Sequence, residues 1–161
     1  MAVDMFFKID TIKGESVDDK HKGSIDILAW SWGMSQAGTT HVGRGGGAGK
    51  VSVQDLSFTK YVDAGSHSLI LACCNGTHIP KAVLTVRKAG EKPLEYLKIE
   101  LDQILVTSVS TGGSGGEDRL TENVTLNFAK FKFIYQPQDA KGGKFGGELV
   151  AWFDIAKNTK V

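Results

Sequence analysis

Short stretches in which apolar and polar residues alternate cover most of the chain, and this period of two predicts β-strands. Two of them flank the turn-like residues 89–93 and predict a hairpin, in whose second arm Leu97, Ile99 and Leu101 share one face. We expect strands at residues 3–9, 24–32, 50–61, 83–88, 94–101, 104–110, 123–136 and 148–155. The intervening glycine clusters, at 43–49, 112–116 and 142–147, predict loops.

One segment has a helical pattern. Ser66 or His67 is suited to cap a helix over residues 68–74, and Asn75-Gly76 supplies a left-handed stop. On such a helix four side chains are expected to point inward: Leu69, Ile70, Cys73 and Cys74. The chain is therefore predicted to be all-β with one short helix, a closed or nearly closed β-barrel of two packed sheets. We expect one domain over residues 1–161, with an extended loop at about 40–50.

The strand at 123–136 carries apolar residues in both phases. Val124, Leu126 and Phe128 alternate, and Phe131, Phe133 and Tyr135 then continue in the opposite phase. Either a β-bulge near Ala129 and Lys130 shifts the phase, or both faces of the strand are covered. The strand at 24–32 has the same property. A second covered face would require a helix or another subunit, and one short helix covers hardly more than one strand. We therefore predict self-association through Trp30, Phe131, Phe133 and Tyr135.

Composition narrows the classes of function. Lys plus Arg number 19 against 18 Asp plus Glu, a formal net charge of +1, which disfavours a nucleic-acid partner and permits association. We expect no membrane partner, and synthesis in the cytoplasm without a cleavable signal, because no apolar run is long enough for either. The adjacent Cys73 and Cys74 do not make a disulfide framework and are expected to be buried, reduced thiols.

No constellation of residues predicts catalysis, a metal or a cofactor. The first glycine cluster is not a phosphate loop, since Arg44 stands where glycine is required and Val51 where Ser or Thr would hold magnesium. Cys73 and Cys74 would point about 100° apart on a helix, so with His67 and His78 they do not converge on zinc. The glycines after Thr111 lack the dinucleotide spacing. We therefore expect neither an enzyme nor a bound cofactor.

Three stretches, at residues 29–33, 53–61 and 110–128, resemble the haemolysin-coregulated protein (Hcp) family, the inner-tube subunit of the bacterial type VI secretion system. The likeness runs to about Gln138. It implies a β-barrel with one helix, assembled into hexameric rings that stack into a tube. It also implies three partners besides the chain itself: a spike protein at the tip, a contractile sheath, and small effector proteins held in the lumen and secreted through the apparatus.

The resemblance further suggests roles for individual residues. Ser31 matches a strand that faces the channel, which makes it a candidate for cargo contact in the lumen. The loop at 41–50 matches the family's extended loop, which reaches the adjacent ring. The predicted ring-stacking residues are Arg44, Gly45, Gly46, Gly47 and Gly90. The alternative from another class is a monomeric β-sandwich that binds carbohydrate on Trp30 and Trp32.

Overall fold

The structure is a computed structural model that describes residues 3–38, 41, 47 and 49–160. One helix, α1 (Ser66–Asn75), accompanies the strands. The strands of the first half are β1 (Val3–Ile9), β2 (Ile25–Asp26), β3 (Ala29–Ser31), β4 (Met34–Ser35), β5 (Ser52–Val53) and β6 (Leu56–Tyr61). Those of the second half are β7 (Ile79–Lys88), β8 (Leu94–Gly112), β9 (Thr121–Tyr135), β10 (Leu149–Asp154) and β11 (Thr159–Lys160).

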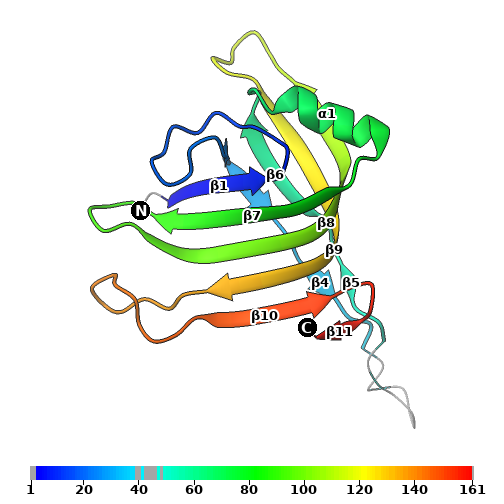
Figure 1. Ribbon diagram of the computed structural model, residues 1–161, viewed down its shortest axis with the longest axis vertical. Helices are drawn as coiled ribbons and strands as arrows, with labels where there is room; N and C mark the ends of the chain where they lie inside the picture. Colours follow the sequence, from blue (N-terminus) through cyan, green and yellow to red (C-terminus); the bar gives the residue numbers. More distant parts are fainter. Residues whose placement is uncertain (1–2, 39–40, 42–46, 48, 161) are drawn as a thin grey trace.

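Nine strands form one antiparallel sheet that branches at β9. The main path runs β11-β10-β9-β8-β7-β1-β2, and β6 pairs with the first half of β9 and carries β3 on its other edge. Strands β4 and β5 form a separate ribbon at the lower right of Figure 1. The two arms of the sheet approach each other at residues 27–28, where Ile27 N donates to Met5 O (3.0 Å) and Leu28 N donates to Thr59 O (2.9 Å).

The two apolar phases of β9 belong to one core. Val124, Leu126, Phe128 and Phe131 all lie in the same buried cluster. The register between β8 and β9 is continuous across this point, from Leu101↔Phe131 to Ile104↔Phe128. Gln103, between those two β8 residues, has a left-handed φ of 54°. The predicted β-bulge near Ala129 and Lys130 is therefore wrong, because the strands keep their register there. The second alternative, a covered second face, is not needed between Val124 and Phe131, since these residues share one core and the irregular residue lies on β8.

The neighbouring strands change phase at the same place. Buried residues on β8 shift from Ile99 and Leu101 to Ile104 and Val106, and on β7 from Ala82 to Ile79. The pairs Ala82↔Leu101 and Ile79↔Ile104 keep one register. Because three paired strands exchange their inward phase together, the sheet bends sharply here and keeps one apolar core on its concave side.

Helix α1 covers one end of the sheet, at the top of Figure 1, and packs against β8. Gly76 ends it in the left-handed region (φ 63°), as predicted. The predicted N-cap is wrong: Gly65 occupies that position and no side chain caps the helix. The predicted inward face is wrong in part, since Leu69 is buried while Ile70 and Cys74 are exposed. Both cysteines are free, and Cys73 is half-buried.

The remaining predictions of strands hold in outline. The hairpin around residues 89–93 is present, but its second arm continues without a break through 104–110 to form the 19 residues of β8. The strand expected at 24–32 is divided into β2 and β3, and the one at 50–61 into β5 and β6. The fold is mostly β with one short helix, and it contains one large bent sheet in place of the two packed sheets expected.

Candidate functional site

Ser31 lies on a face of the sheet that consists of small polar side chains. It pairs with Ser57 on β6, Ser57 pairs with Thr125 on β9, and Thr125 pairs with Ser108 on β8. Directly paired residues of antiparallel strands project from the same face. Four strands therefore contribute one row of hydroxyl groups, and the next row contains Ala29, Thr59, Asn123 and Ser110. Neither row contains an ionisable side chain.

Hydrogen bonds hold this polar face together. The hydroxyl oxygens of Ser108 and Thr125 lie 2.7 Å apart, and Thr59 Oγ1 donates to Asn123 Oδ1 at 2.6 Å. At the margin of the face, Asp55 accepts hydrogen bonds from Thr107 Oγ1 (2.7 Å) and Asn127 Nδ2 (3.0 Å). These contacts fix the side chains in a flat, hydrophilic surface that can form hydrogen bonds with another protein.

Sequence analysis identified Ser31 and missed the other members of this face. The signal was present in the alternation of residues 56–59 and of the first half of β9, where every second residue is small and polar. The opposite side of the same strands is buried, with Phe58 and Val124 in the core. Trp30 pairs with Phe58 and packs against that core, so its side chain lies on the core side of the sheet.

A groove separates the β4–β5 ribbon from β9 and β10. It has a volume of about 940 Å³, and its walls are mostly apolar. Six of its lining residues are Trp32, Met34, Val53, Phe133, Val150 and Trp152. The ring of Trp32 also packs edge-on against Phe131, with centroids 4.8 Å apart. The buried Trp32 Nε1 finds no hydrogen-bond acceptor among the described residues. A cavity of this size and composition is suited to an apolar segment of another protein.

Strand β10 forms an exposed apolar edge beside this groove. Val150 is 50% exposed and Trp152 is 38% exposed. Strand β11 covers the outer edge of β10 only at Phe153 and Asp154, so residues 149–152 have no partner on that edge within the described chain. An edge strand with apolar residues on both faces is a surface at which proteins associate.

The predicted interface residues on β9 differ in how much surface they offer. Phe131 is only 6% exposed and is covered by its own chain, whereas Phe133 is half-buried and Tyr135 is 38% exposed. The predicted contact with another subunit therefore depends mainly on Phe133 and Tyr135, together with β10, which the sequence analysis did not select.

Two of the predicted ring-stacking residues, Gly47 and Gly90, lie within the described chain. Gly90, with a positive φ of 142°, belongs to the β7–β8 hairpin loop on the left of Figure 1, and the β4–β5 ribbon lies at the lower right. Gly47, in the segment between β4 and β5, is half-buried. Arg44, Gly45 and Gly46 lie outside the described residues.

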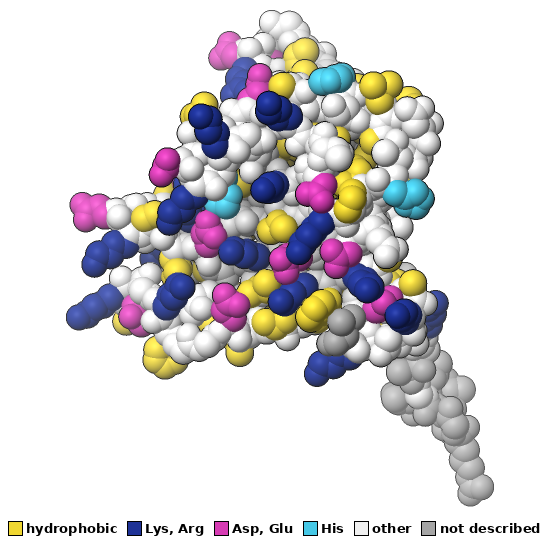
Figure 2. Space-filling model, viewed as in Figure 1, with side chains coloured by type: hydrophobic (Ala, Val, Ile, Leu, Met, Phe, Trp, Pro, Cys, Tyr) yellow, Lys and Arg dark blue, Asp and Glu magenta, His cyan; other side chains and the backbone are white. Residues whose placement is uncertain are grey.

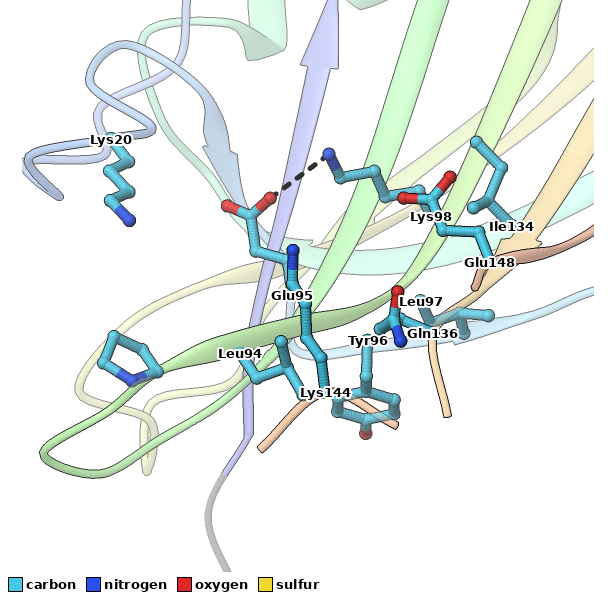
Figure 3. A pocket seen from close by; sticks show the side chains of 11 residues that line it. Lys20, Leu94, Glu95, Tyr96, Leu97, Lys98, Ile134, Gln136, Lys144 and Glu148 are labelled. Carbon is cyan, nitrogen blue, oxygen red and sulfur yellow. Dashed lines mark ion pairs between the residues drawn. The ribbon is translucent and has the colours of Figure 1, made fainter. Parts of the chain in front are cut away.

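A smaller pocket of about 210 Å³ lies where β8 begins, near the loop after β9 (Figure 3). Lys20, Lys98 and Lys144 face it together with Glu95 and Glu148, so both signs of charge are present. Glu95 pairs with Lys98 (3.3 Å) and with His21 (2.6 Å). Partial burial alone would raise the pKa of Glu95, but these two partners outweigh burial and lower it.

Charged side chains of both signs are interspersed over the outer face of the sheet in Figure 2. Paired positions alternate in sign across β7, β8 and β9, from Lys81 to Asp102 to Lys130. His67, Cys73, Cys74 and His78 do not converge: no group of three potential metal ligands occurs within the described part of the chain. None of the helices described is long and apolar enough to cross a membrane.

Comparison with known proteins identifies the family. Residues 6–135 match the family model described as "Type VI secretion system effector, Hcp". The chain belongs to the Hcp family. It is 62% identical over 161 residues to the protein hcp1 of Pseudomonas aeruginosa strain PAO1, covering 99% of both chains.

Solved structures agree with this assignment. Hcp1 of Salmonella typhimurium is 42% identical, with a TM-score of 0.83 and complete coverage of both chains. A structure named as a type six secretion system protein superposes more closely, with a TM-score of 0.92 at 29% identity, covering 99% of this chain and 100% of the other. The resemblance predicted from residues 29–33, 53–61 and 110–128 is confirmed. Hcp proteins form the tube of the type VI secretion system and are not enzymes.

Proposed function

We propose that this Hcp protein assembles as hexameric rings that stack into the inner tube of the apparatus, and that the polar face around Ser31 lines the lumen. The observation that carries the proposal is the contrast between two surfaces of one chain. The rows of hydroxyl and amide groups on β3, β6, β9 and β8 are suited to water and cargo. The exposed apolar β10 and its groove are suited to another subunit.

The contacts of residues 27–28 support closure of the barrel in this arrangement. The hydrogen bonds of Ile27 and Leu28 join β1 to β6 across the gap between the two arms of the sheet. We infer a single domain over residues 1–161 whose wall is closed, with the loop at about 40–50 extending from it. Gly90 and the β4–β5 ribbon lie on opposite sides of the molecule, as head-to-tail stacking of rings requires.

The partners follow from the same assignment. We propose that small effector proteins occupy the lumen, that a spike protein sits at the tip of the tube, that a contractile sheath surrounds it, and that the protein leaves the cell through this apparatus. The surface of mixed charge over β7, β8 and β9 lies on the opposite side of the sheet from the core and is available to an outer partner. The carbohydrate-binding alternative loses its support, since Trp30 packs against the core and Trp32 packs on Phe131.

Sedimentation of the purified full-length chain tests the assembly. A species of six times the 17.3 kDa chain is expected, and a dominant species of 17.3 kDa contradicts the proposal.

Cargo contact is tested by Ser31→Lys, which places a long cationic side chain on the uncharged rows. Rings are expected to form normally, while the amount of effector co-purified with them falls about tenfold or more, because the cation disturbs the contact surface. Ser35→Lys, on the exposed ribbon strand β4, is the matched control. Equal effector content in the two variants would show that Ser31 does not contact cargo.

A further inference from the structure

A second exposed apolar surface lies at the other end of the molecule from the groove. Leu120 is 47% exposed and Val62 is 41% exposed. They are neighbours, because Val62 N donates to Leu120 O at 2.9 Å. We call these two residues the apolar corner. The segment between β8 and β9 that carries Leu120 is at the top of Figure 1, whereas β10 and the β4–β5 ribbon are at the bottom.

Local packing holds the apolar corner in place. The side chain of Leu120 lies over Gly113, where a Cβ atom would come within 2.1 Å of Leu120 Cδ2. The neighbouring Arg119 places its guanidinium carbon 3.8 Å from the centre of the Tyr61 ring. A glycine beneath Leu120 and a stacked arginine beside it keep the corner projecting from the surface, which lowers the entropy cost of binding.

The charges around the two surfaces are complementary. Glu117 and Asp118 are exposed immediately before the apolar corner. Lys160 lines the groove, and Lys132 lies 4.9 Å from the ring centre of Trp152 at its edge. Apart from Arg119, which stacks on Tyr61, the charged residues next to Leu120 are acidic, and the two beside the groove are lysines. This complementarity favours one orientation of docking.

We propose that the groove of one copy receives the apolar corner of the next copy, and that this contact joins neighbouring subunits within a ring. The inference deepens the ring assembly proposed above and rests on it. In a symmetric dimer each patch would meet the same patch of the partner, so a groove and a corner at opposite ends of one chain would not meet each other. They instead make a head-to-tail contact that repeats until the ring closes. The line from the apolar corner to the groove and the line from Gly90 to the β4–β5 ribbon both end near the ribbon, but they run in different directions (Figure 1).

Two variants, each lacking one half of the contact, test the proposal. Val150→Asp places a carboxylate in the groove and leaves the corner intact, while Leu120→Asp does the reverse. Each variant alone is expected to be monomeric in sedimentation. An equimolar mixture is expected to form a dimer of twice the 17.3 kDa chain mass and nothing larger. The intact groove of the Leu120→Asp chain then binds the intact corner of the Val150→Asp chain, and no further pair of intact surfaces remains. Val17→Asp, at a position 93% exposed and outside both patches, should form wild-type rings.

The outcomes separate this contact from ring assembly itself. A monomeric wild-type chain would overturn ring assembly. Rings formed by both aspartate variants, or a mixture that stays monomeric while each variant keeps the wild-type circular dichroism spectrum, would overturn the groove-and-corner contact and leave ring assembly standing.

A charge exchange provides an independent measurement that does not depend on apolar substitution. Asp118→Lys and Lys160→Asp are each expected to weaken association about tenfold, and the double variant is expected to restore most of it. Additive losses in the double variant would contradict the proposed pairing.

Discussion

An arginine makes several of the contacts that attach the segment between β1 and β2 to the sheet. Arg87, buried on β7, donates to Asp18 Oδ1 (2.7 Å) and Oδ2 (3.0 Å) and to Asp4 Oδ2 (3.1 Å). The hydrogen bonds from Arg87 lower the pKa of Asp18 to about 2. Nearby, His21 stacks on Phe6 with ring centres 4.5 Å apart. The segment thus depends on an ionised carboxylate at residue 18.

Asp18→Asn is therefore expected to destabilise the fold in a pH-dependent way. A carboxyl group whose pKa is lowered on folding stabilises the native state above its unfolded pKa of about 4, and this contribution is lost as pH falls toward 2. The unfolding midpoint of the variant should lie below that of the wild type at pH 7, and the two should converge between pH 4 and pH 2. A difference that stays constant over this range would contradict the role of the charge.

Lys60, which is fully buried on β6, is a second buried cation that pairs with carboxylates. It pairs with Glu122, also buried, and its Nζ lies 3.0 Å from Asp63 Oδ1. Lys60 also donates to Ser66 Oγ at 3.1 Å, at the first residue of α1. The cluster joins β6, β9 and the start of the helix. It is made by Glu122 Oε1, while Glu122 Oε2 has no hydrogen-bond partner among the described residues.

Lys60→Met is expected to cost about 3–5 kcal/mol of unfolding free energy, because it leaves Glu122 buried and unpaired. Denaturant unfolding measures this cost. Adding Glu122→Leu should recover most of the stability, since an apolar pair of similar volume needs no desolvated charge. Lys81→Met is the surface control: its pair with Glu100 is 3.5 Å long and half exposed, and should change stability by less than about 1 kcal/mol.

At the scale of elements, strand predictions succeeded where apolar and polar residues alternate clearly. The alternation of Val3–Ile9 and of Leu94–Leu101 marks the core face directly, and both predictions are confirmed. The bend of the sheet was not predictable, because its cause is a register shared by three strands together with one left-handed residue, Gln103. A single strand viewed alone shows only a change of phase, so sequence analysis left two alternatives open.

Only part of the candidate site could be predicted from the sequence. Ser31 could be selected from the motif around it, but the other hydroxyl groups on its face depend on which strands pair with which. The exposed apolar residues of β10 have no periodicity that distinguishes them from a buried strand. Their exposure becomes visible only when the neighbours of β10 are known.

The loop between β4 and β5 allows a prediction at the element scale. The ribbon pairs Ser35 with Ser52, and Gly49 N donates to Ala37 O at 3.4 Å. Replacing residues 38–48 by Asn-Gly should close this ribbon as a tight hairpin and leave the core intact. Rings are expected to persist while the length of stacked tubes falls, because the loop is proposed to reach the next ring. Microscopy of tubes of unchanged length would contradict that role.

For the whole molecule, the proposed assembly uses three surfaces. In this proposal the polar face around Ser31 lines the channel, β10 and its groove meet the next subunit, and the sides that carry Gly90 and the β4–β5 ribbon stack between rings. The ribbon takes part in both contacts, since it also forms one wall of the groove. The bent sheet leaves its outer surfaces available because its concave side is filled by the core. A net charge of +1 adds little repulsion between copies.

The most direct test of this account is negative-stain electron microscopy of the purified full-length protein. The account predicts six-membered rings with an open central channel, and their association into stacks at high protein concentration. A field of separate particles the size of a single 17.3 kDa chain, without a central channel, would contradict it.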